Sequence, residues 1–269
     1  MGSMDGKIAI VTGSTQGLGS AVALLFAKRG AAGLVICGRN EAKGRAKVDE
    51  SKKAHGTKAV FVSADLTKVE DCEKIVAECD QAFGRVDALV NAAGDTSRGT
   101  IIDTDPALYD KIFAINTRAP FFLMQHAISL VRRDRVEGAF VNISSMSSMG
   151  GQSFIAAYCA SKGALDTLTR NTAHALLRNR IRVNALNIGW MASEGEIKLQ
   201  REFHHQPDNW LEEASAKQPF GRLLDPVEVA RAVAFLACDE SGMMTGATIN
   251  FDQSVWGAYN DAPHPATAL

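Results

Sequence analysis

Short apolar runs rich in β-branched residues alternate along the chain with longer stretches in which apolar residues recur every three or four positions. Nearly continuous apolar runs are typical of strands covered on both faces of a sheet, and the longer period predicts helices. Such alternation indicates βαβ units and a parallel sheet. We expect strands at residues 7–12, 33–38, 58–64, 88–91, 138–144, 182–187 and 248–251. We expect helices at residues 19–29, 41–55, 69–83, 106–133, 157–178 and 226–238.

These elements predict an α/β fold, a Rossmann-type doubly wound sheet of seven parallel strands flanked by helices. No internal repeat or Gly/Ser-rich linker divides the chain, so we expect a single domain over residues 4–259. Residues 190–219 are polar and aromatic and far longer than a connection of about four residues, and we expect a substrate lid there. Residues 260–269 have no periodic pattern and are expected to form a C-terminal tail.

The composition narrows the class of protein without identifying it. The 269 residues include 29 Lys and Arg against 30 Asp and Glu, and such a balance does not suit a protein that neutralises many phosphates, so we expect no nucleic-acid partner. The longest mostly apolar stretch, residues 119–131, is too short to span a bilayer, so we expect no membrane partner. Five cysteines without CxxC spacing and the lack of a signal-peptide pattern favour a cytoplasmic location.

Three glycines follow the first expected strand and open the first helix, in the sequence T-G-S-T-Q-G-L-G of residues 12–19. Gly13 would permit the tight turn, Gly17 would let the backbone approach a pyrophosphate, and Gly19 would allow close helix packing. The spacing differs from G-x-G-x-x-G, and glycines alone also fit a loop without a ligand. Their position directly after the first strand favours a dinucleotide site.

The end of the second expected strand, residues 35–40, lacks the carboxylate that holds the ribose hydroxyls in enzymes that prefer NAD. Arg39 stands there instead, and a guanidinium can pair with a 2′-phosphate. We therefore predict a preference for NADP. The alternative, in which Arg39 stacks on the adenine or faces solvent while NAD is accepted, stays open.

Tyr158 and Lys162 are four residues apart in an expected helix, so both side chains lie on one helical face. A phenol normally titrates near 10, and a nearby lysine cation lowers its pKa toward the range useful for acid/base catalysis. A lone Y-x-x-x-K is also a common surface feature. The motifs around it decide the interpretation.

The chain resembles the short-chain dehydrogenase/reductase family from Met4 to about Gly257. This resemblance implies hydride transfer between a nicotinamide and an alcohol or carbonyl, without a metal. It rests on residues in the order and spacing of the family, namely T-G-x3-G-x-G at 12–19, Asp65, N-A-A-G at 91–94, Asn116, Ser145, Tyr158 and Lys162.

The resemblance also assigns roles. Tyr158 would be the general acid in reduction and the base in oxidation, and Ser145 would hydrogen-bond the reacting oxygen. Lys162 would lower the pKa of the tyrosine and hold the nicotinamide ribose, and Asn116 would anchor a water that passes protons to bulk. The expected cofactor-binding residues are Gly13, Ser14, Thr15, Gln16, Gly17, Leu18, Gly19, Arg39, Asn40, Asp65, Leu66, Asn91, Ala92, Ala93, Gly94, Tyr158, Lys162 and Gly189.

Two segments depart from the family pattern. Ile188 stands before Gly189 where the family has proline, so we expect a looser backbone there. Residues 252–256 replace a usual double glycine, which leaves the course of the C-terminus open. The resemblance further implies a homotetramer, or a homodimer, built on the helices that carry Asn116 and Tyr158.

The resemblance implies a small alcohol or carbonyl compound as substrate, and we expect Ser145, Gln152, Tyr158 and Trp190 to contact it. Polar groups around an indole suit a sugar, polyol or sugar acid, because each hydroxyl removed from water needs a partner. A hydrophobic ketone or a 3-oxoacyl compound remains the alternative, and a non-catalytic dinucleotide-binding sensor is a further one. The neighbouring candidates are Met146, Ser147, Met149, Phe154, Met191, Glu194, Glu196, His204, His205 and Trp210.

Overall fold

The computed structural model describes residues 3–255 and contains one seven-stranded sheet in which every neighbouring pair is parallel. The strand order β3-β2-β1-β4-β5-β6-β7 reverses direction between β1 and β4, which is where α/β sheets of this kind bind ligands. All seven expected strands are confirmed, with ends shifted by at most one residue. Their bounds are β1 Ile8–Val11, β2 Gly33–Gly38, β3 Lys58–Ser63, β4 Ala88–Asn91, β5 Gly138–Ser145, β6 Ile181–Ile188 and β7 Thr248–Phe251.

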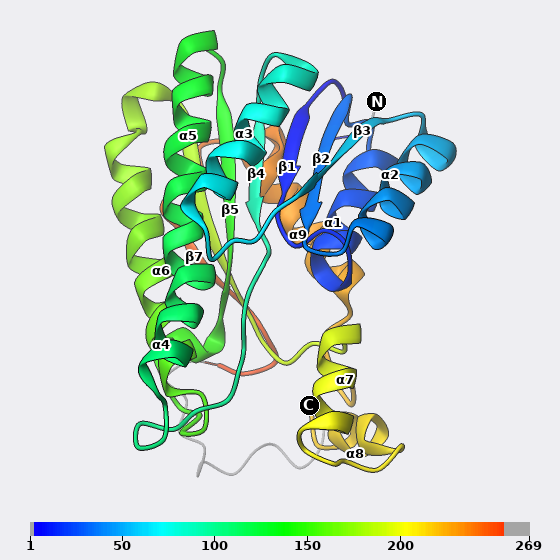
Figure 1. The fold of residues 1–269 in the computed structure, drawn as a ribbon, viewed down its shortest axis with the longest axis vertical. Coiled ribbons are helices and arrows are strands. Elements are labelled where there is room, and N and C mark those ends of the chain that lie inside the picture. Colours follow the sequence, from blue (N-terminus) through cyan, green and yellow to red (C-terminus); the bar gives the residue numbers. More distant parts are fainter. Residues whose placement is uncertain (1–2, 256–269) are drawn as a thin grey trace, which may run out of the picture.

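Helices cover both faces of the sheet, as the doubly wound fold predicts (Figure 1). One face is covered by α1 Gly17–Lys28, α2 Glu41–His55 and α9 Pro226–Ala237, and the other by α3 Val69–Phe83, α5 Ala119–Asp134 and α6 Ala156–Ala175. The apolar core on the first face packs these helices against β1, β2 and β4–β6 and includes the fully buried Phe26. The core on the opposite face includes Phe140. Short 3₁₀ turns occupy Met146–Met149, Leu177–Asn179 and Asp239–Ser241.

The helix expected over residues 106–133 is interrupted. Helix α4 spans Pro106–Phe113, and a π-helical turn at Ala114–Arg118 joins it to α5. The interruption follows from Pro120, which has no N–H to donate to the carbonyl of Asn116, and the N–H of Ala119 instead bonds to the carbonyl of Ala114, five residues back. Insertions of this type often mark functional sites. Here the wide turn contains Asn116.

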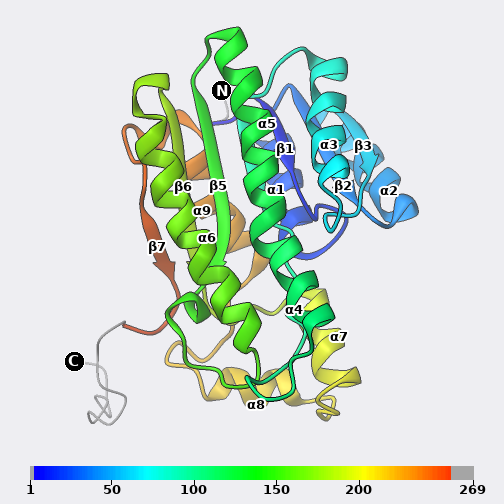
Figure 2. The ribbon, with the colours of Figure 1, turned by 60° about the vertical axis from the view of Figure 1, so that its left-hand side comes forward.

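Residues 190–219 form two short helices, α7 Glu194–Glu202 and α8 Trp210–Ala216, that extend beyond the carboxyl edge of the sheet (Figures 1 and 2). Leu224 joins this segment to the body through two backbone hydrogen bonds, of 2.9 Å from Ala192 and 3.0 Å to Trp190. A small separate core packs Trp210 and Ala214 of this segment against Leu223, which follows it in the chain. Its place over the cleft suits the expected lid, and the expected tail at 260–269 lies outside the described residues. Among residues 3–255, no helix combines the length and apolarity needed to cross a bilayer.

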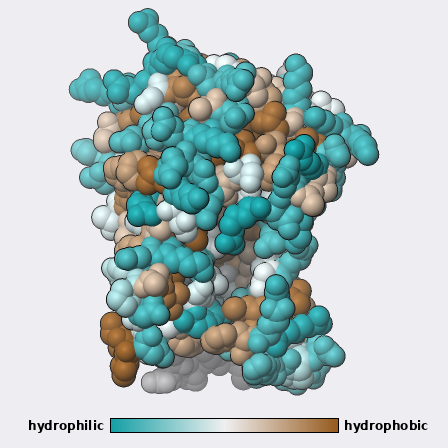
Figure 3. All heavy atoms as spheres, in the orientation of Figure 1, coloured by the Kyte–Doolittle hydropathy of each residue, from teal (hydrophilic) through white to brown (hydrophobic). Residues whose placement is uncertain are grey.

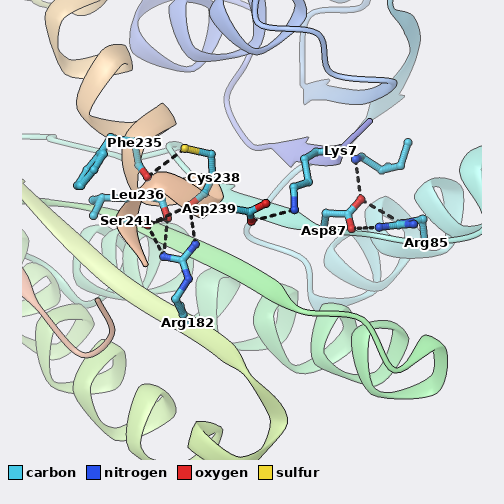
Figure 4. A network of polar contacts seen from close by, with 10 residues as sticks. Lys7, Arg85, Asp87, Arg182, Phe235, Leu236, Cys238, Asp239 and Ser241 are labelled. Atoms are coloured by element: carbon cyan, nitrogen blue, oxygen red, sulfur yellow. Dashed lines mark hydrogen bonds and ion pairs between the residues drawn. The ribbon is translucent and has the colours of Figure 1, made fainter. Parts of the chain in front are cut away.

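The amino edge of the sheet is fastened by a polar network (Figure 4). Arg182, at the start of β6, donates to the carbonyls of Leu236 and Cys238 and to the hydroxyl of Ser241, and so satisfies the end of α9. Close by, the carboxylate of Asp87 accepts from the N–H of Ile8 and from Arg85. These contacts fix the sheet at the edge opposite to its carboxyl ends.

Replacing Arg182 with methionine should lower the free energy of unfolding by about 2 to 3 kcal/mol, because two carbonyls and a hydroxyl at the end of α9 lose a charged donor. Urea denaturation followed by circular dichroism measures this. Arg180→Met is the matched control, because Arg180 is mostly exposed and only pairs with Glu137, so its loss should cost less than about 1 kcal/mol. Equal losses in the two variants would contradict the role given to Arg182.

Candidate active site

A cleft of about 890 Å³ opens at the carboxyl edge of the sheet, between the start of α1 and the 190–219 segment. The space-filling view shows this face hollowed between the body and the two small helices (Figure 3). One end of the cleft is lined by the glycine loop and by residues that follow β2 and β3. The other end is lined by Tyr158 and by side chains of α7.

The glycine loop has the geometry that the sequence predicts. Gly13 and Gly17 adopt left-handed φ values of 64° and 55°, which favour glycine. A Cβ on Gly13 would lie 2.9 Å from the Cα of Ala93, and a Cβ on Gly19 would lie 2.5 Å from the carbonyl oxygen of Gly13. Gly13 therefore lets the loop pass close to the end of β4, and Gly19 lets α1 pack on the loop. Among residues 3–255, the nearest atom that a Cβ on Gly17 would meet is the Cβ of Ser193, at 4.0 Å, so the cleft side of the loop is open.

The loop after β4 forms the opposite wall. The hydroxyl of Thr12 accepts from the N–H groups of Ala92 and Ala93, at 3.0 and 3.1 Å, and fixes this loop to β1. A Cβ on Gly94 would occupy the space 3.7 Å from the ammonium nitrogen of Lys162. These bare backbone surfaces and the start of α1 fit a dinucleotide: the loop and helix would hold its phosphates, and Lys162 its ribose.

Three of the expected cofactor residues do not line the cleft with their side chains. The Ser14 hydroxyl bonds to the backbone of Val11 and Cys37, where it joins β1 to β2. Asn40 caps α2 by accepting from the N–H of Lys43, and Asn91 is buried and donates to Asn142. Short polar side chains favour such backbone bonds at strand ends and helix caps. The other expected cofactor residues line the cleft.

Arg39 and Asp65 lie at the far end of the cleft. Hydrogen bonds from the backbone N–H and the hydroxyl of Thr67 hold the pKa of Asp65 below its usual value, and the charge of Arg39 contributes in the same direction. Arg39 is exposed and has no carboxylate within ion-pair distance among residues 3–255. Lys43, which the sequence reading did not select, adds a second cation here through a 3.0 Å bond to Gln16.

Tyr158 and Ser145 meet where α6 passes the end of β5, and both are at least nine-tenths buried. Burial raises the pKa of Tyr158 to about 12, although hydrogen bonding to Ser145 lowers it. This corrects the expectation that Lys162 would bring the pKa of the tyrosine below its normal value. The phenol is protonated at neutral pH, which is the form that can donate a proton.

Lys162 lies one helical turn after Tyr158, with its ammonium nitrogen 5.7 Å from the centroid of the phenol ring and 2.7 Å from the carbonyl oxygen of Ile143. Burial lowers the pKa of Lys162 to about 8, and the negative charge of Asp166 opposes this shift. Asp166 is itself buried and stands one further turn along α6. Its spacing of four residues after Lys162 is a sequence signal that our reading missed.

Asn116 is fully buried in the π-helical turn. Its side chain accepts from the N–H of Asp95 at 2.8 Å and donates to the carbonyl of Asp95 at 2.9 Å and to the hydroxyl of Ser161 at 3.0 Å. It therefore ties the loop after β4 to the helix that carries Tyr158. Asn116, which the sequence selected for the site, thus also holds the loop after β4 in place against helix α6.

The substrate end of the cleft mixes polar and apolar groups. Trp190 donates to the carboxylate of Glu196 at 2.8 Å, and Gln200 donates to the same oxygen at 2.7 Å. The hydroxyl of Ser147 donates to Gln152 at 2.7 Å. Of the further candidates, Met146, Ser147, Phe154, Met191, Glu196 and His204 line the cleft, whereas Met149, Glu194, His205 and Trp210 do not.

Arg98 also lines this end and was missed by the sequence reading. The only available signal was a cation shortly after the N-A-A-G motif, and that position does not reveal which way the side chain points.

The backbone near Ile188 is firmer than expected. Ile188 pairs with Phe251 within the sheet, and Gly189 donates to the same residue at 3.1 Å.

Comparisons with known proteins agree with this architecture. A family model described as enoyl-(acyl carrier protein) reductase matches residues 13–254. An oxidoreductase of Thermotoga maritima described as uncharacterized is 37% identical over 250 residues, covering 93% of this chain and 97% of that protein. Tetrahydroxynaphthalene reductase of Pyricularia oryzae is 30% identical over 260 residues, covering 93% of this chain and 89% of that protein.

The solved structure of a short-chain type dehydrogenase/reductase from Mycobacterium marinum superimposes with a TM-score of 0.81 at 26% identity, covering 93% of this chain and 95% of that one. The fold, the family model and the relatives agree. The chain belongs to the short-chain dehydrogenase/reductase family of oxidoreductases.

The buried Lys162 predicts a pH dependence for the oxidoreductase activity in the reductive direction. If the lysine acts as a cation, kcat/KM should fall as the pH rises through about 8, where Lys162 loses its proton, while Tyr158 with its pKa of about 12 stays protonated. Asp166→Asn removes the charge that raises the pKa of Lys162, so the midpoint should move to lower pH. Asp49→Asn, an exposed carboxylate on α2, is the control. A profile that Asp166→Asn leaves unmoved would contradict this assignment.

Proposed function

We propose that the protein is an NADP-preferring carbonyl reductase that interconverts a ketone and a secondary alcohol. The observation that carries the proposal is the convergence of Ser145, Tyr158 and Lys162 at the carboxyl edge of the sheet, beside a glycine loop with open backbone. A bound nicotinamide supplies or accepts the hydride. A non-catalytic sensor would have no use for a buried phenol and ammonium held in this geometry.

Tyr158 would donate its proton to the oxygen of the carbonyl as hydride reaches the carbon. Its high pKa, caused by burial, keeps the proton available at neutral pH, and the developing alkoxide is a strong base that accepts it. Ser145 would donate a hydrogen bond to the same oxygen and stabilise the charge that forms there. In the oxidative direction the same two groups would act in reverse.

Lys162 would stabilise the tyrosinate left after proton transfer, since an ammonium near a phenolate favours its charged form. Asn116 would help a proton from solvent return to the tyrosinate. Pro120 has no N–H to donate to the backbone carbonyl of Asn116 in the α-helical pattern. This carbonyl would therefore accept a hydrogen bond from a water that connects Lys162 to bulk solvent. The side chain of Asn116 would hold that carbonyl in place through Asp95 and Ser161.

The substrate we propose is a ketone on a ring framework that bears oxygen substituents. Phe154, Trp190 and Met191 offer apolar surface for the ring. The name of the Pyricularia oryzae relative describes an aromatic ring with hydroxyl groups, which agrees with this mixed lining. Polar partners for the substituents would come from Gln152, Gln200, Gln206 and Gln218.

A sugar, polyol or sugar acid is the second candidate substrate. The four glutamine side chains at the substrate end of the cleft favour it, because amides pair with hydroxyls as both donors and acceptors. A carbonyl panel in which only flat aromatic ketones are reduced would favour the first candidate. Turnover of open-chain polyols would favour the second.

The same proposal includes a homotetramer, or a homodimer, in the cytoplasm. All five cysteines are free. A largely apolar groove of about 640 Å³ runs along α4, α5 and α6, lined by residues that include Phe113, Phe121 and Leu168. A second copy of the chain would cover it, with the helices that carry Asn116 and Tyr158 at the contact.

Tyr158→Phe tests the chemical role. The variant keeps the ring in its buried place but removes the proton donor, so kcat for carbonyl reduction should fall by roughly a hundredfold to ten-thousandfold. Oxidation of NADPH over a panel of ketones and aldehydes measures the rate, and quenching of protein fluorescence measures cofactor binding, which should be unchanged. Full activity in this variant would refute the mechanism.

Arg39→Met tests the choice of cofactor. Loss of a guanidinium that pairs with the 2′-phosphate should lower kcat/KM with NADPH by roughly tenfold to a hundredfold and leave the value with NADH nearly unchanged. Arg45→Met is the control, because Arg45 is exposed on α2 and pairs with Glu41. A wild-type enzyme that works better with NADH would refute the preference.

A further inference from the structure

Arg98 stands at the substrate end of the cleft, on the loop between β4 and α4, and is half-buried there. Its Nε donates to Nε2 of His204 at 3.3 Å, and its Nη1 donates to the carbonyl oxygen of Thr96 at 3.0 Å. The guanidinium carbon lies 5.3 Å from the ring centroid of Phe154, within the range of a cation–π contact. The side chain is thus held in one orientation by three neighbours.

The carboxylates that line the same end of the cleft already have partners. Asp95 pairs with Lys111 at 2.7 Å, Glu196 accepts from Trp190, and Asp252 accepts from Ser254. None of these acids lies within ion-pair distance of Arg98, and neither does any other carboxylate among residues 3–255. A half-buried guanidinium that is fixed in orientation and has no anionic partner is available to pair with an anionic group of a ligand.

The unused edge of the guanidinium is suited to an oxyanion. Nη2 donates no hydrogen bond to any of residues 3–255, and the planar group binds carboxylate and phenolate oxygens with two parallel donors. His204 accepts from Arg98 through Nε2 and so occupies only the Nε donor, which leaves the Nη2 side of the guanidinium free.

Arg98 lies near Tyr158, the proposed proton donor. The positive charge of Arg98 is close enough to lower the pKa of Tyr158, and Phe154, beneath the guanidinium, lines the cleft together with Tyr158. A substrate whose carbonyl reaches Tyr158 would therefore present its far substituent to Arg98. Glu196 does not take that substituent's place, because its oxygen accepts from Trp190 and Gln200.

We propose that the substrate carries an anionic oxygen group, a carboxylate or an ionised phenol, and that Arg98 binds this group while the carbonyl lies against Tyr158. This inference rests on the proposed reductase function and specifies its substrate class. Arg98 is then a residue that determines specificity, and it contacts a part of the substrate remote from the reaction.

Matched pairs of small aldehydes test the proposal. Both 3- and 4-carboxybenzaldehyde are compared with their methyl esters, and 4-hydroxybenzaldehyde with 4-methoxybenzaldehyde, at about pH 8, where conjugation with the aldehyde leaves this phenol largely ionised, with NADPH as reductant. The wild-type enzyme should show kcat/KM about tenfold or more higher for the anionic member of at least one pair, from a charge-assisted hydrogen bond. The pair that responds distinguishes a carboxylate from a phenolate.

Variants show whether the preference comes from Arg98. Arg98→Met should abolish the preference within the responding pair while retaining turnover of the neutral member, and Arg98→Lys should retain part of it, because the charge remains without the planar fork. Arg180→Met, far from the cleft and mostly exposed, should keep the wild-type preference. An equal loss on both members of the pair in Arg98→Met would mean that Arg98 only supports the structure, and would overturn the proposal.

A binding measurement keeps the test independent of turnover. Calorimetry on the NADP complex should show benzoate binding more tightly than benzamide, and Arg98→Met should remove that difference; equal binding of the two to the wild-type protein would overturn the proposal. Reduction of neutral aldehydes with no preference for anionic ones would refute only this inference. Failure to reduce any carbonyl compound, together with intact NADP binding, would instead refute the proposed function.

Discussion

The close approach of three backbone segments determines where everything else in the cleft can lie. The carbonyl of Gly13 leaves room only for a hydrogen atom on Gly19, and Gly13 itself leaves no room for a side chain against Ala93. Strand β1, helix α1 and the loop after β4 therefore meet with almost no side-chain volume between them. Because Thr12 also fixes the loop after β4, one crowded junction places the glycine loop on one wall and Gly94 on the other.

The strands were predictable because a parallel sheet covered on both faces requires nearly continuous apolar runs. The prediction of one continuous helix over residues 106–133 was wrong, because Pro120 interrupts its hydrogen bonds. The periodicity of apolar residues persists through a π-helical turn, whereas the missing N–H of proline redirects the hydrogen bonds. The pattern therefore predicted the presence of the helices but not the widened turn around Asn116.

The proposed catalytic residues were selected from their spacing in the sequence, but spacing does not determine their electrostatics. The sequence places Lys162 one turn from Tyr158, yet burial of both groups decides their pKa values, and burial depends on β5, α6 and the loop after β4 together. Arg98 shows the same limit. Its position in the chain indicated a loop cation, and only the tertiary fold brings it beside Phe154 and His204.

The 190–219 segment is joined to the body by two backbone bonds with Leu224 and carries its own small core around Trp210. Its packing is thus largely separate from the two cores on the faces of the sheet. Substitutions on its cleft-facing side can change the lining of the cleft without weakening the sheet that holds Tyr158. In evolutionary terms, the cleft lining supplied by α7 and the core of the sheet belong to different parts of the chain, so this lining can change with little loss of stability.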